Sequence, residues 1–280
     1  MKALANSEML PNVTARARSY VKGVVARTPL GQPLQTWYRR RRAIRDLGVW
    51  TPRDENARRF YSQLFRPGDL CFDIGANRGN RTKVFRRLAA RVVAVEPQGS
   101  CMAVLQGAYK DDPQVTLVQA ACGSIHGQGR LRVCELDGLS SLSDEWIAAV
   151  SESGRFAKEG WTKQEPCAVV TLDELIQQHG APAFVKIDVE GYELHVLQGL
   201  TRPIGCVSFE FTPERFETAI ACVEHLHSLG LREFNVSWGE SFELALEAWA
   251  PRDRLAAVLG KYRDDKVIFG DVYARNLAAQ

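Results

Sequence analysis

Two carboxylates stand where the first two predicted strands of this 280-residue chain end. Asp73 comes directly before a turn that contains Gly75 and Gly79, and Glu96 follows a second apolar run. Glycine lets a backbone approach a ligand closely and adopt positive φ. A carboxylate before such a turn repels a pyrophosphate and attracts a cation, and a carboxylate after the second strand offers two acceptor oxygens to a ribose. The pattern predicts a site for a positively charged nucleoside without phosphate.

S-adenosylmethionine (SAM) is such a ligand, since it carries an ammonium, a sulfonium, a ribose diol and no phosphate. The dinucleotide fingerprint G-x-G-x-x-G is matched at one glycine position of three, because Asn77 and Asn80 follow Gly75 at the other two. A nicotinamide cofactor is therefore the weaker alternative, and for Glu96 alone a solvated strand-end carboxylate is another. The candidate cofactor residues are Asp73, Gly75, Ala76, Asn77, Gly79, Glu96, Pro97 and, among small residues that leave room for a flat ring, Ala121.

Three further carboxylates accompany two later apolar runs. Asp188 ends the run Phe184–Ile187, Glu190 follows two residues later, and Glu210 stands near the end of Cys206–Phe211. The carboxyl ends of parallel strands share one edge of a sheet, so these groups are expected to converge on one cleft. Methyl transfer from a sulfonium needs in-line positioning, and an acceptor that loses a proton benefits from a general base. Candidate catalytic residues are therefore Asp188, Glu210 and Glu190, and Asp188 is also a candidate cofactor residue.

Other roles for these carboxylates stay open. Asp188 and Glu210 offer hard oxygen ligands that suit Mg²⁺, although no metal site is predicted. Glu190 or Glu193 could instead stabilise the start of the following helix, where negative charge is favoured. Lys186 lies within the strand and is expected to pair with a neighbouring carboxylate rather than take part in chemistry.

Short apolar runs alternate with helical patterns from residue 54 onward, which predicts an α/β fold with a parallel-cored sheet covered on both faces. Thr171 is a candidate N-cap for one of the helices. The richer Gly, Ser and charge content of residues 124–168 indicates an insertion or lid. Strands are expected at 70–74, 92–95, 115–118, 131–134, 184–187, 206–211, 232–236 and 266–269, and helices at 55–64, 81–90, 101–109, 172–178, 192–197 and 216–229.

Residues 1–50 form a basic extension. They hold ten Lys/Arg and two Asp/Glu, a charge of +8, while the remaining 230 residues carry −5. A helical pattern covers residues 13–25, and the sequence WYRRRRAIR (Trp37–Arg45) places four arginines behind two aromatics. This composition suits peripheral contact with an anionic membrane surface or a nucleic acid. The alternative is a solvated helix packed on the domain, and no firm nucleic-acid partner is predicted.

Apolar runs and cysteine spacing indicate the cellular compartment of the protein. No apolar run is long enough to span a bilayer, and Met1–Leu10 has no apolar segment typical of a signal peptide. Seven scattered cysteines form no C-x-x-C pair, which favours buried reduced thiols over disulfides or zinc ligands. A cytoplasmic protein that can associate with a membrane surface is the expectation.

Four motifs resemble those of the FkbM family of SAM-dependent methyltransferases: PGDLCFDIGANRGNRT, VVAVEP, VTLDEL and FVKIDVEGYELHVLQGL. The resemblance covers residues 55–212. It implies a Rossmann-like class I methyltransferase domain at 51–280, with a mostly parallel seven-stranded sheet, and O-methylation of a hydroxyl on a sugar, glycolipid or natural product. The chain departs from the family pattern at Arg81 and at FEFTPE (Phe209–Glu214), where a histidine is expected near the proline.

The expected partner is thus a small-molecule or glycan hydroxyl acceptor. A second hypothesis of another class is a nucleic-acid or membrane-associated binding module on a degenerate methyltransferase fold, with the basic extension as its working surface.

Overall fold

The computed structural model describes residues 31–134, 136–156, 158–265 and 267–276. The chain divides into two compact units, 1–46 and 47–280. The described part of the first unit belongs to helix α2 (Gly31–Leu47). Within it the guanidinium of Arg41 lies 4.6 Å from the ring centroid of Trp37. The helix predicted over residues 13–25 lies outside the described residues.

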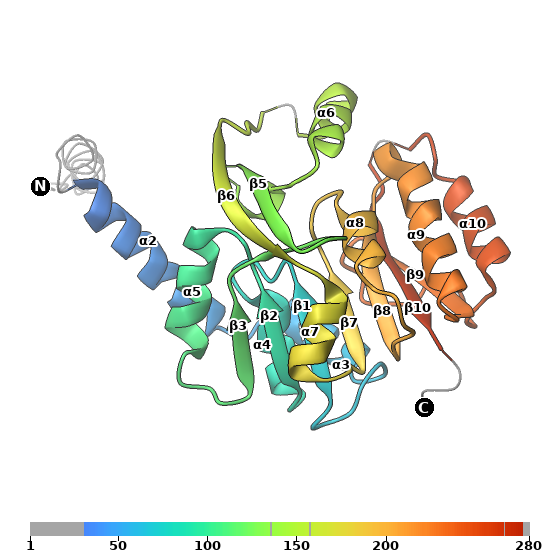
Figure 1. Cartoon of the computed structure of the whole chain (residues 1–280), viewed down its shortest axis with the longest axis horizontal. Helices are drawn as coiled ribbons and strands as arrows, with labels where there is room; N and C mark the ends of the chain where they lie inside the picture. Colours follow the sequence, from blue (N-terminus) through green and yellow to red (C-terminus); the bar gives the residue numbers. More distant parts are fainter. Residues whose placement is uncertain (1–30, 135, 157, 266, 277–280) are drawn as a thin grey trace, which may run out of the picture. The chain divides into compact units, whose positions relative to one another are not determined.

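A seven-stranded sheet forms the centre of the second unit (Figure 1). The strand order is β3-β2-β1-β7-β8-β10-β9, and β10 runs antiparallel to both of its neighbours. The other pairings, β1 with β2 and β7, β2 with β3, and β7 with β8, are parallel. The strands are β1 (Leu70–Ile74), β2 (Arg91–Val95), β3 (Val115–Val118), β7 (Phe184–Ile187), β8 (Cys206–Phe211), β9 (Glu233–Trp238) and β10 (Gly270–Arg275).

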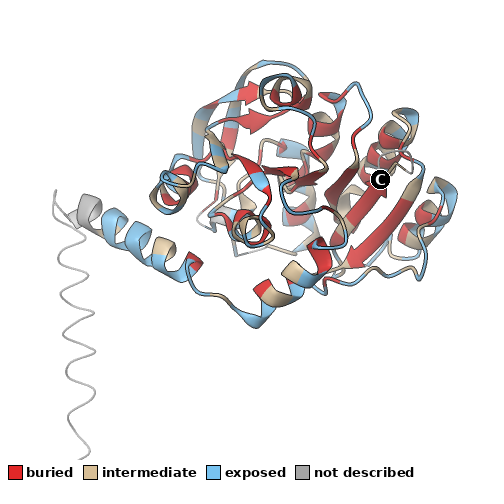
Figure 2. Cartoon of the chain, turned by 90° about the horizontal axis from the view of Figure 1, so that it is seen from below, coloured by how far each residue is buried: buried red, intermediate tan, exposed pale blue. Residues whose placement is uncertain are grey.

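Helices cover both faces of this sheet, and the strands between them are buried (Figure 2). One core cluster joins the sheet to α3 (Pro52–Tyr61), α4 (Asn80–Arg87) and α5 (Gly99–Tyr109). The other joins it to α7 (Leu172–His179), α8 (Glu193–Gln198), α9 (Phe216–Ser228) and α10 (Arg252–Gly260). The prediction of a mostly parallel sheet with helices on both faces is confirmed.

Local sequence sets the boundaries of several elements. The predicted N-cap Thr171 is confirmed, since its hydroxyl accepts from the backbone N–H of Glu174 and the Glu174 carboxylate accepts from that of Thr171. Such a reciprocal pair satisfies two backbone donors that have no partner within the helix. All seven cysteines are buried, where a thiol behaves as a small hydrophobe. No described helix is both long and apolar enough to span a bilayer.

The segment expected as an insertion forms a small second sheet and a helix. Strands β4 (Ala121–Cys122), β6 (Lys163–Val170) and β5 (Gly127–Val133) pair in that order. Between β5 and β6 lie the 3₁₀ turn η1 (Asp137–Leu139) and helix α6 (Asp144–Ser153). Figure 1 places this segment above the carboxyl ends of the main parallel strands. It is therefore positioned to cover whatever binds at that edge.

The predicted strand at 266–269 is wrong, because the last strand is Gly270–Arg275. The Asp265 side chain accepts from the backbone N–H groups of Val267 and Ile268, which folds this apolar stretch into a turn. Val267 is 82% exposed. Pairing begins at Gly270, where an added Cβ would lie 2.2 Å from the carbonyl oxygen of Ser237. The apolar pattern located a strand four residues too early because a side-chain cap took its backbone donors.

Candidate active site

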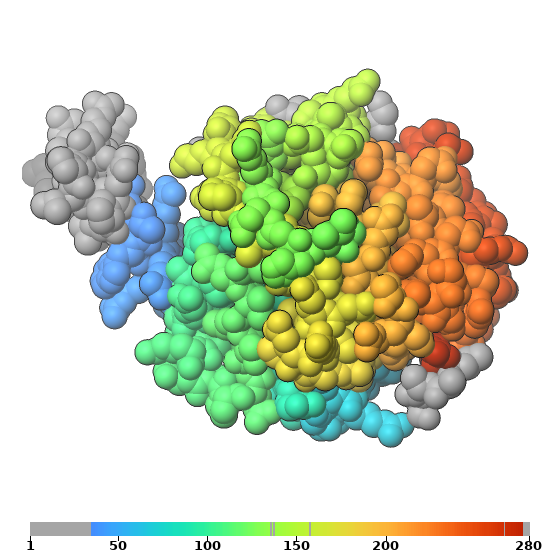
Figure 3. Space-filling model, in the orientation of Figure 1, coloured from blue at the N-terminus to red at the C-terminus, as the bar shows by residue number. Residues whose placement is uncertain are grey.

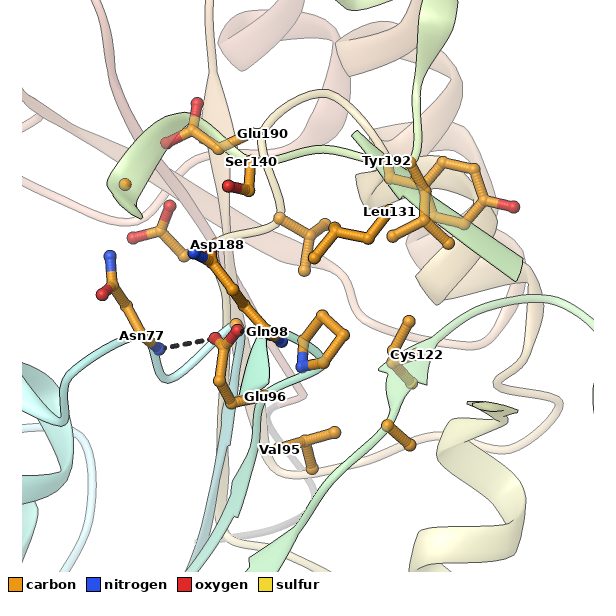
Figure 4. A pocket seen from close by; sticks show the side chains of 17 residues that line it. Asn77, Val95, Glu96, Gln98, Cys122, Leu131, Ser140, Asp188, Glu190 and Tyr192 are labelled. Atoms are coloured by element: carbon orange, nitrogen blue, oxygen red, sulfur yellow. Dashed lines mark hydrogen bonds between the residues drawn. The ribbon is translucent and has the colours of Figure 1, made fainter. Parts of the chain in front are cut away.

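A pocket of about 160 Å³ opens at the carboxyl ends of β1, β2 and β7, beneath the insertion. Figure 4 shows a polar end, with Asn77, Asp188 and Glu190, and an apolar end, with Leu131, Cys122 and Tyr192. The sequence-predicted residues that line it are Gly75, Asn77, Glu96, Pro97, Ala121, Asp188 and Glu190; the further lining residues are Val95, Gln98, Ala120, Cys122, Leu131, Gly138, Ser140, Leu142, Val189 and Tyr192.

The turn after β1 is held in place by the end of β2. The backbone N–H groups of Gly75 and Ala76 both donate to the carbonyl oxygen of Val95, at 2.9 and 3.0 Å. Gly75 has φ +78°, and a Cβ added to it would lie 1.8 Å from the carbonyl oxygen of Asp188. Asn77 has φ +49°, a region that asparagine tolerates better than most residues. Glycine is thus required at 75 because two strand ends meet there.

Glu96 joins the ends of the first two strands. One carboxylate oxygen accepts from the backbone N–H of Asn77 at 2.8 Å, and the other accepts from that of Gln98 at 2.7 Å. The residue is 6% exposed and lines the pocket. Each carboxylate oxygen has two acceptor positions. A buried carboxylate at the end of the second strand, held by two backbone donors, suits recognition of two neighbouring ribose hydroxyls.

Asp73, Ala76 and Gly79 do not line the pocket. The Asp73 carboxylate is 1% exposed and accepts from the Thr82 hydroxyl at 2.6 Å, behind the turn. Burial raises the pKa of Asp73, although the bond from Thr82 and the charge of Lys186 oppose this. Gly79 precedes α4 in a left-handed conformation, φ +94°. The carboxylate of Asp73 thus bonds to Thr82 and does not line the pocket. Its direct contact with a cofactor stays a prediction.

The apolar end of the pocket draws on residues that the sequence did not indicate. Leu131 comes from β5 and Tyr192 from the residue before α8. The Tyr192 ring stacks on the His195 ring, with centroids 4.2 Å apart and planes 6° apart. Together with Ala121 and Cys122, these side chains offer flat and apolar surface that suits an adenine ring.

Asp188, Glu190 and Glu210 are brought together beside the polar end. One carboxylate oxygen from each lies within 4.8 Å of those of the other two. Burial, together with the neighbouring carboxylates, raises the pKa values of Glu190 and Glu210 well above the usual range. Such a group can accept a proton or hold a hard cation. The geometry of the three carboxylates is consistent with a general base and with a Mg²⁺ site.

The turn that carries Glu190 is pinned by the insertion. Glu190 has φ +54° and Gly191 has φ +86°. The Ser141 hydroxyl donates to the carbonyl oxygen of Glu190 at 2.6 Å. A Cβ added to Gly191 would lie 2.2 Å from Cγ of Trp146, so α6 rests directly on this turn. Trp146, which is 1% exposed, therefore packs the insertion onto the site.

The insertion is also clamped to the C-terminal part of the sheet. Arg155 donates to Glu214 at 2.7 Å and to the carbonyl oxygens of Val267 and Ile268 at 3.1 and 3.0 Å. The Arg155 and Glu214 side chains are 10% and 7% exposed, so this ion pair is largely shielded from water. Figure 3 shows the insertion, in green to yellow-green, lying against the orange segments that contain Glu214. The insertion that covers the pocket is thus fixed at the Glu190 turn and at the segments that contain Glu214 and Val267.

Comparisons with known proteins agree with this architecture. The model of the methyltransferase FkbM domain family matches residues 73–233, more than half of the chain. No curated protein matched the sequence. A TehB-like SAM-dependent methyltransferase from Corynebacterium glutamicum superposes with a TM-score of 0.44 at 10% identity, covering 87% of this chain and 100% of that chain.

Two further solved structures are similar at the same level. Precorrin-6Y C5,15-methyltransferase from Geobacter metallireducens gives a TM-score of 0.40 at 14% identity, covering 78% of this chain and 85% of that one. Aeropyrum pernix fibrillarin, with natively bound S-adenosyl-L-methionine, gives 0.38 at 13% identity, covering 75% and 67%.

Proposed function

The chain belongs to the FkbM family of SAM-dependent methyltransferases, and from this premise we propose that it methylates a hydroxyl of a small molecule or glycan. The observation that supports this acceptor class is the group of Asp188, Glu190 and Glu210 beside the polar end of the cofactor pocket. A hydroxyl must lose its proton as its oxygen takes the methyl group, and a carboxylate within hydrogen-bond reach can accept that proton.

The rest of the pocket suits SAM bound with its sulfonium end toward these carboxylates. In the proposed binding mode Glu96 binds the ribose hydroxyls, the apolar end holds the adenine, and Asp188 lies by the methionine part; the support is that Glu96, Leu131, Cys122, Tyr192 and Asp188 all line the pocket. This arrangement directs the sulfonium methyl group toward the three carboxylates. The chain's own contribution is to hold sulfur, methyl carbon and acceptor oxygen in line, and to exclude water beneath the insertion.

A cofactor titration tests the donor site. We expect calorimetry to detect binding of SAM but not of NAD, whose pyrophosphate would face the buried carboxylates. Glu96→Ala should weaken SAM binding by roughly 1–3 kcal/mol through loss of charged hydrogen bonds. Glu247→Ala, at an exposed position away from the pocket, is the matched control. An unchanged dissociation constant for Glu96→Ala would refute the ribose assignment.

The acceptor is found by incubating the protein with SAM labelled in its methyl group and with fractionated cell extract. Expected is label on a hydroxyl oxygen of a sugar, glycolipid or natural product. Label on a nitrogen or on carbon would contradict O-methylation, and label on nucleic acid would contradict a small-molecule or glycan acceptor. Running the reaction with and without EDTA separates the two roles of the carboxylate group, because a required divalent cation makes the activity EDTA-sensitive and a simple general base does not.

We also propose that α2 contacts an anionic membrane surface, which would bring the enzyme to a lipid-borne acceptor. Trp37 and Tyr38 are 51% and 62% exposed, and four consecutive arginines follow them. Adjacent exposed Trp and Tyr are typical of side chains at a membrane interface. A nucleic-acid-binding module built on an inactive fold is the competing hypothesis.

Changing all four residues Arg39–Arg42 to glutamine in the full chain should reduce binding to vesicles that contain phosphatidylglycerol. Each arginine near such a surface contributes about 1 kcal/mol, so binding at low salt should be almost lost. Flotation with anionic and with neutral vesicles measures this effect. SAM affinity should not change, since the pocket lies wholly within the second unit. Tighter binding of the wild type to an oligonucleotide than to vesicles would favour the competing hypothesis.

A further inference from the structure

A buried lysine lies directly behind the candidate general base. Lys186 is 1% exposed, and its ammonium group donates to three oxygens, each at 3.1 Å: Oδ2 of Asp188, Oδ1 of Asp271 and the carbonyl oxygen of Ile187. An ammonium group has three N–H donors, so all of them are used. Burial alone would lower the pKa of Lys186, but the two carboxylates raise it well above the usual value. The group is a fixed, fully bonded cation.

Asp271 reaches this cation because β10 is antiparallel to its neighbours. The first residues of an antiparallel strand lie at the edge where the parallel strands end, so Asp271 pairs with Glu210 in the register of β8 and β10. Lys186 pairs with Ser208 on β8, and this small side chain leaves room for the lysine to extend across β8. The other oxygen of Asp271 accepts from the Tyr273 hydroxyl at 3.4 Å. A chain of bonds thus runs from the core to the pocket.

The two ends of this chain differ in their access to solvent. The Asp271 side chain is 14% exposed and that of Lys186 is 1% exposed, whereas the Asp188 side chain is 36% exposed and lines the pocket. A buried ion pair is weak evidence of stabilisation, because desolvation offsets much of the attraction. Core strands commonly carry an apolar residue at such a position. The ammonium group of Lys186 therefore acts mainly on Asp188, the member of this group that lines the pocket.

We propose that Lys186 and Asp271 are positioning residues for methyl transfer, which hold the Asp188 carboxylate in one orientation toward the cofactor and acceptor. This inference depends on the proposed function. The charged groups that face Asp188 are Lys186 on its own strand, Glu190 and Glu193 after it, Glu210 on β8, Asp271 on β10 and Asp73 on β1. Since five of these six are carboxylic acids, Lys186 supplies the attraction that fixes Asp188 against their repulsion.

The test compares two nucleosides and uses a double-mutant cycle. SAM carries the methionine part that lies by Asp188, whereas 5′-methylthioadenosine keeps only the adenine and ribose parts. We expect Lys186→Met in the full chain to weaken SAM binding about threefold to tenfold through the lost orientation of one charged hydrogen-bonding group. Binding of 5′-methylthioadenosine should stay within about twofold of the wild type, because its contacts with Glu96 are untouched.

The decisive comparison is with Asp188→Asn. If Lys186 acts through Asp188, the double variant Lys186→Met/Asp188→Asn should bind SAM no more weakly than Asp188→Asn alone. A purely structural lysine would lower the affinity for both nucleosides, and its effect would recur in full in the Asp188→Asn background; either result overturns the inference. Lys110→Met is the matched control, since the Lys110 side chain is 69% exposed and lies 3.8 Å from Asp111.

Removal of a buried lysine leaves carboxylates without a partner, and a second variant keeps the test valid if Lys186→Met does not fold. Asp271→Asn keeps the lysine and the side-chain shape, and should weaken SAM binding less than Lys186→Met and likewise only while Asp188 is present. If the wild type binds SAM but the effects of Lys186→Met and Asp188→Asn are fully additive, this inference is contradicted and the proposed function is not. A wild-type chain that binds neither nucleoside contradicts the proposed function and this inference with it.

Discussion

Gly75→Ala is expected to abolish measurable SAM binding and to lower the free energy of unfolding by roughly 2–4 kcal/mol, the sum of a left-handed residue and a forced overlap. The added Cβ would lie 1.8 Å from the carbonyl oxygen of Asp188. The end of β7 is backbone and cannot rotate away as a side chain does. The strand end that carries Asp188 must therefore move, and the pocket between β1 and β7 changes shape.

Gly68→Ala provides a matched control for the conformational part of this effect. Gly68 has φ +89°, close to that of Gly75, but nothing lies within 4 Å of an added Cβ. It should cost only the left-handed conformation, about 1–2 kcal/mol, and leave SAM affinity unchanged. Thermal or denaturant unfolding and calorimetry on both variants measure the difference. If Gly75→Ala bound SAM as Gly68→Ala does, the close approach of the two strand ends would not be what the site requires.

Much of the pocket's polar side could be predicted because it is encoded locally. A strand end, a glycine turn and a second strand end fix Gly75, Asn77 and Glu96 within a few residues of each other in the chain or in the sheet. The rule that ligands bind at the carboxyl ends of parallel strands then adds Asp188. Each step uses the spacing of apolar runs, which the sequence shows directly.

The remaining residues depend on long-range geometry that spacing does not encode. Leu131 reaches the pocket only because β5 pairs with β6, where its register partner Glu165 lies 34 residues later in the chain. Asp271 approaches Lys186 from a separation of 85 residues, and only because β10 is antiparallel. The predicted strand at 266–269 would have put Asp271 beyond the strand's end. Because the cap by Asp265 delays the start of β10, the sequence pattern did not indicate that Asp271 completes the group of charges around Lys186.

Asp73 illustrates a different difficulty. Its charge and its position before the turn predict contact with a cationic ligand, whereas its carboxylate accepts from Thr82 and does not line the pocket. Successive side chains of a strand point to opposite faces. The sequence places a carboxylate at the end of the strand, but which face of the sheet its side chain takes depends on what packs against the strand.

Asp188→Asn is expected to lower the rate of methyl transfer about a hundredfold or more, since general-base catalysis contributes roughly 10²–10⁴. SAM affinity should fall by only about threefold to tenfold, because an amide keeps one acceptor oxygen and loses one charged interaction. The amide also retains the shape of the side chain, so the packing of the site is kept. The rate is measured with methyl-labelled SAM and the extract fraction that gains label, and the affinity by calorimetry.

The division between rate and affinity is what identifies the role of Asp188. A group that acts only when the acceptor loses its proton stabilises the transition state and leaves the ground state nearly unchanged. Asp253→Asn is the matched control, because Asp253 also pairs with a cation, Arg252, at 2.9 Å, but its side chain is 85% exposed. Equal losses of rate and affinity in Asp188→Asn would assign it to cofactor binding, and would move the general base to Glu190 or Glu210.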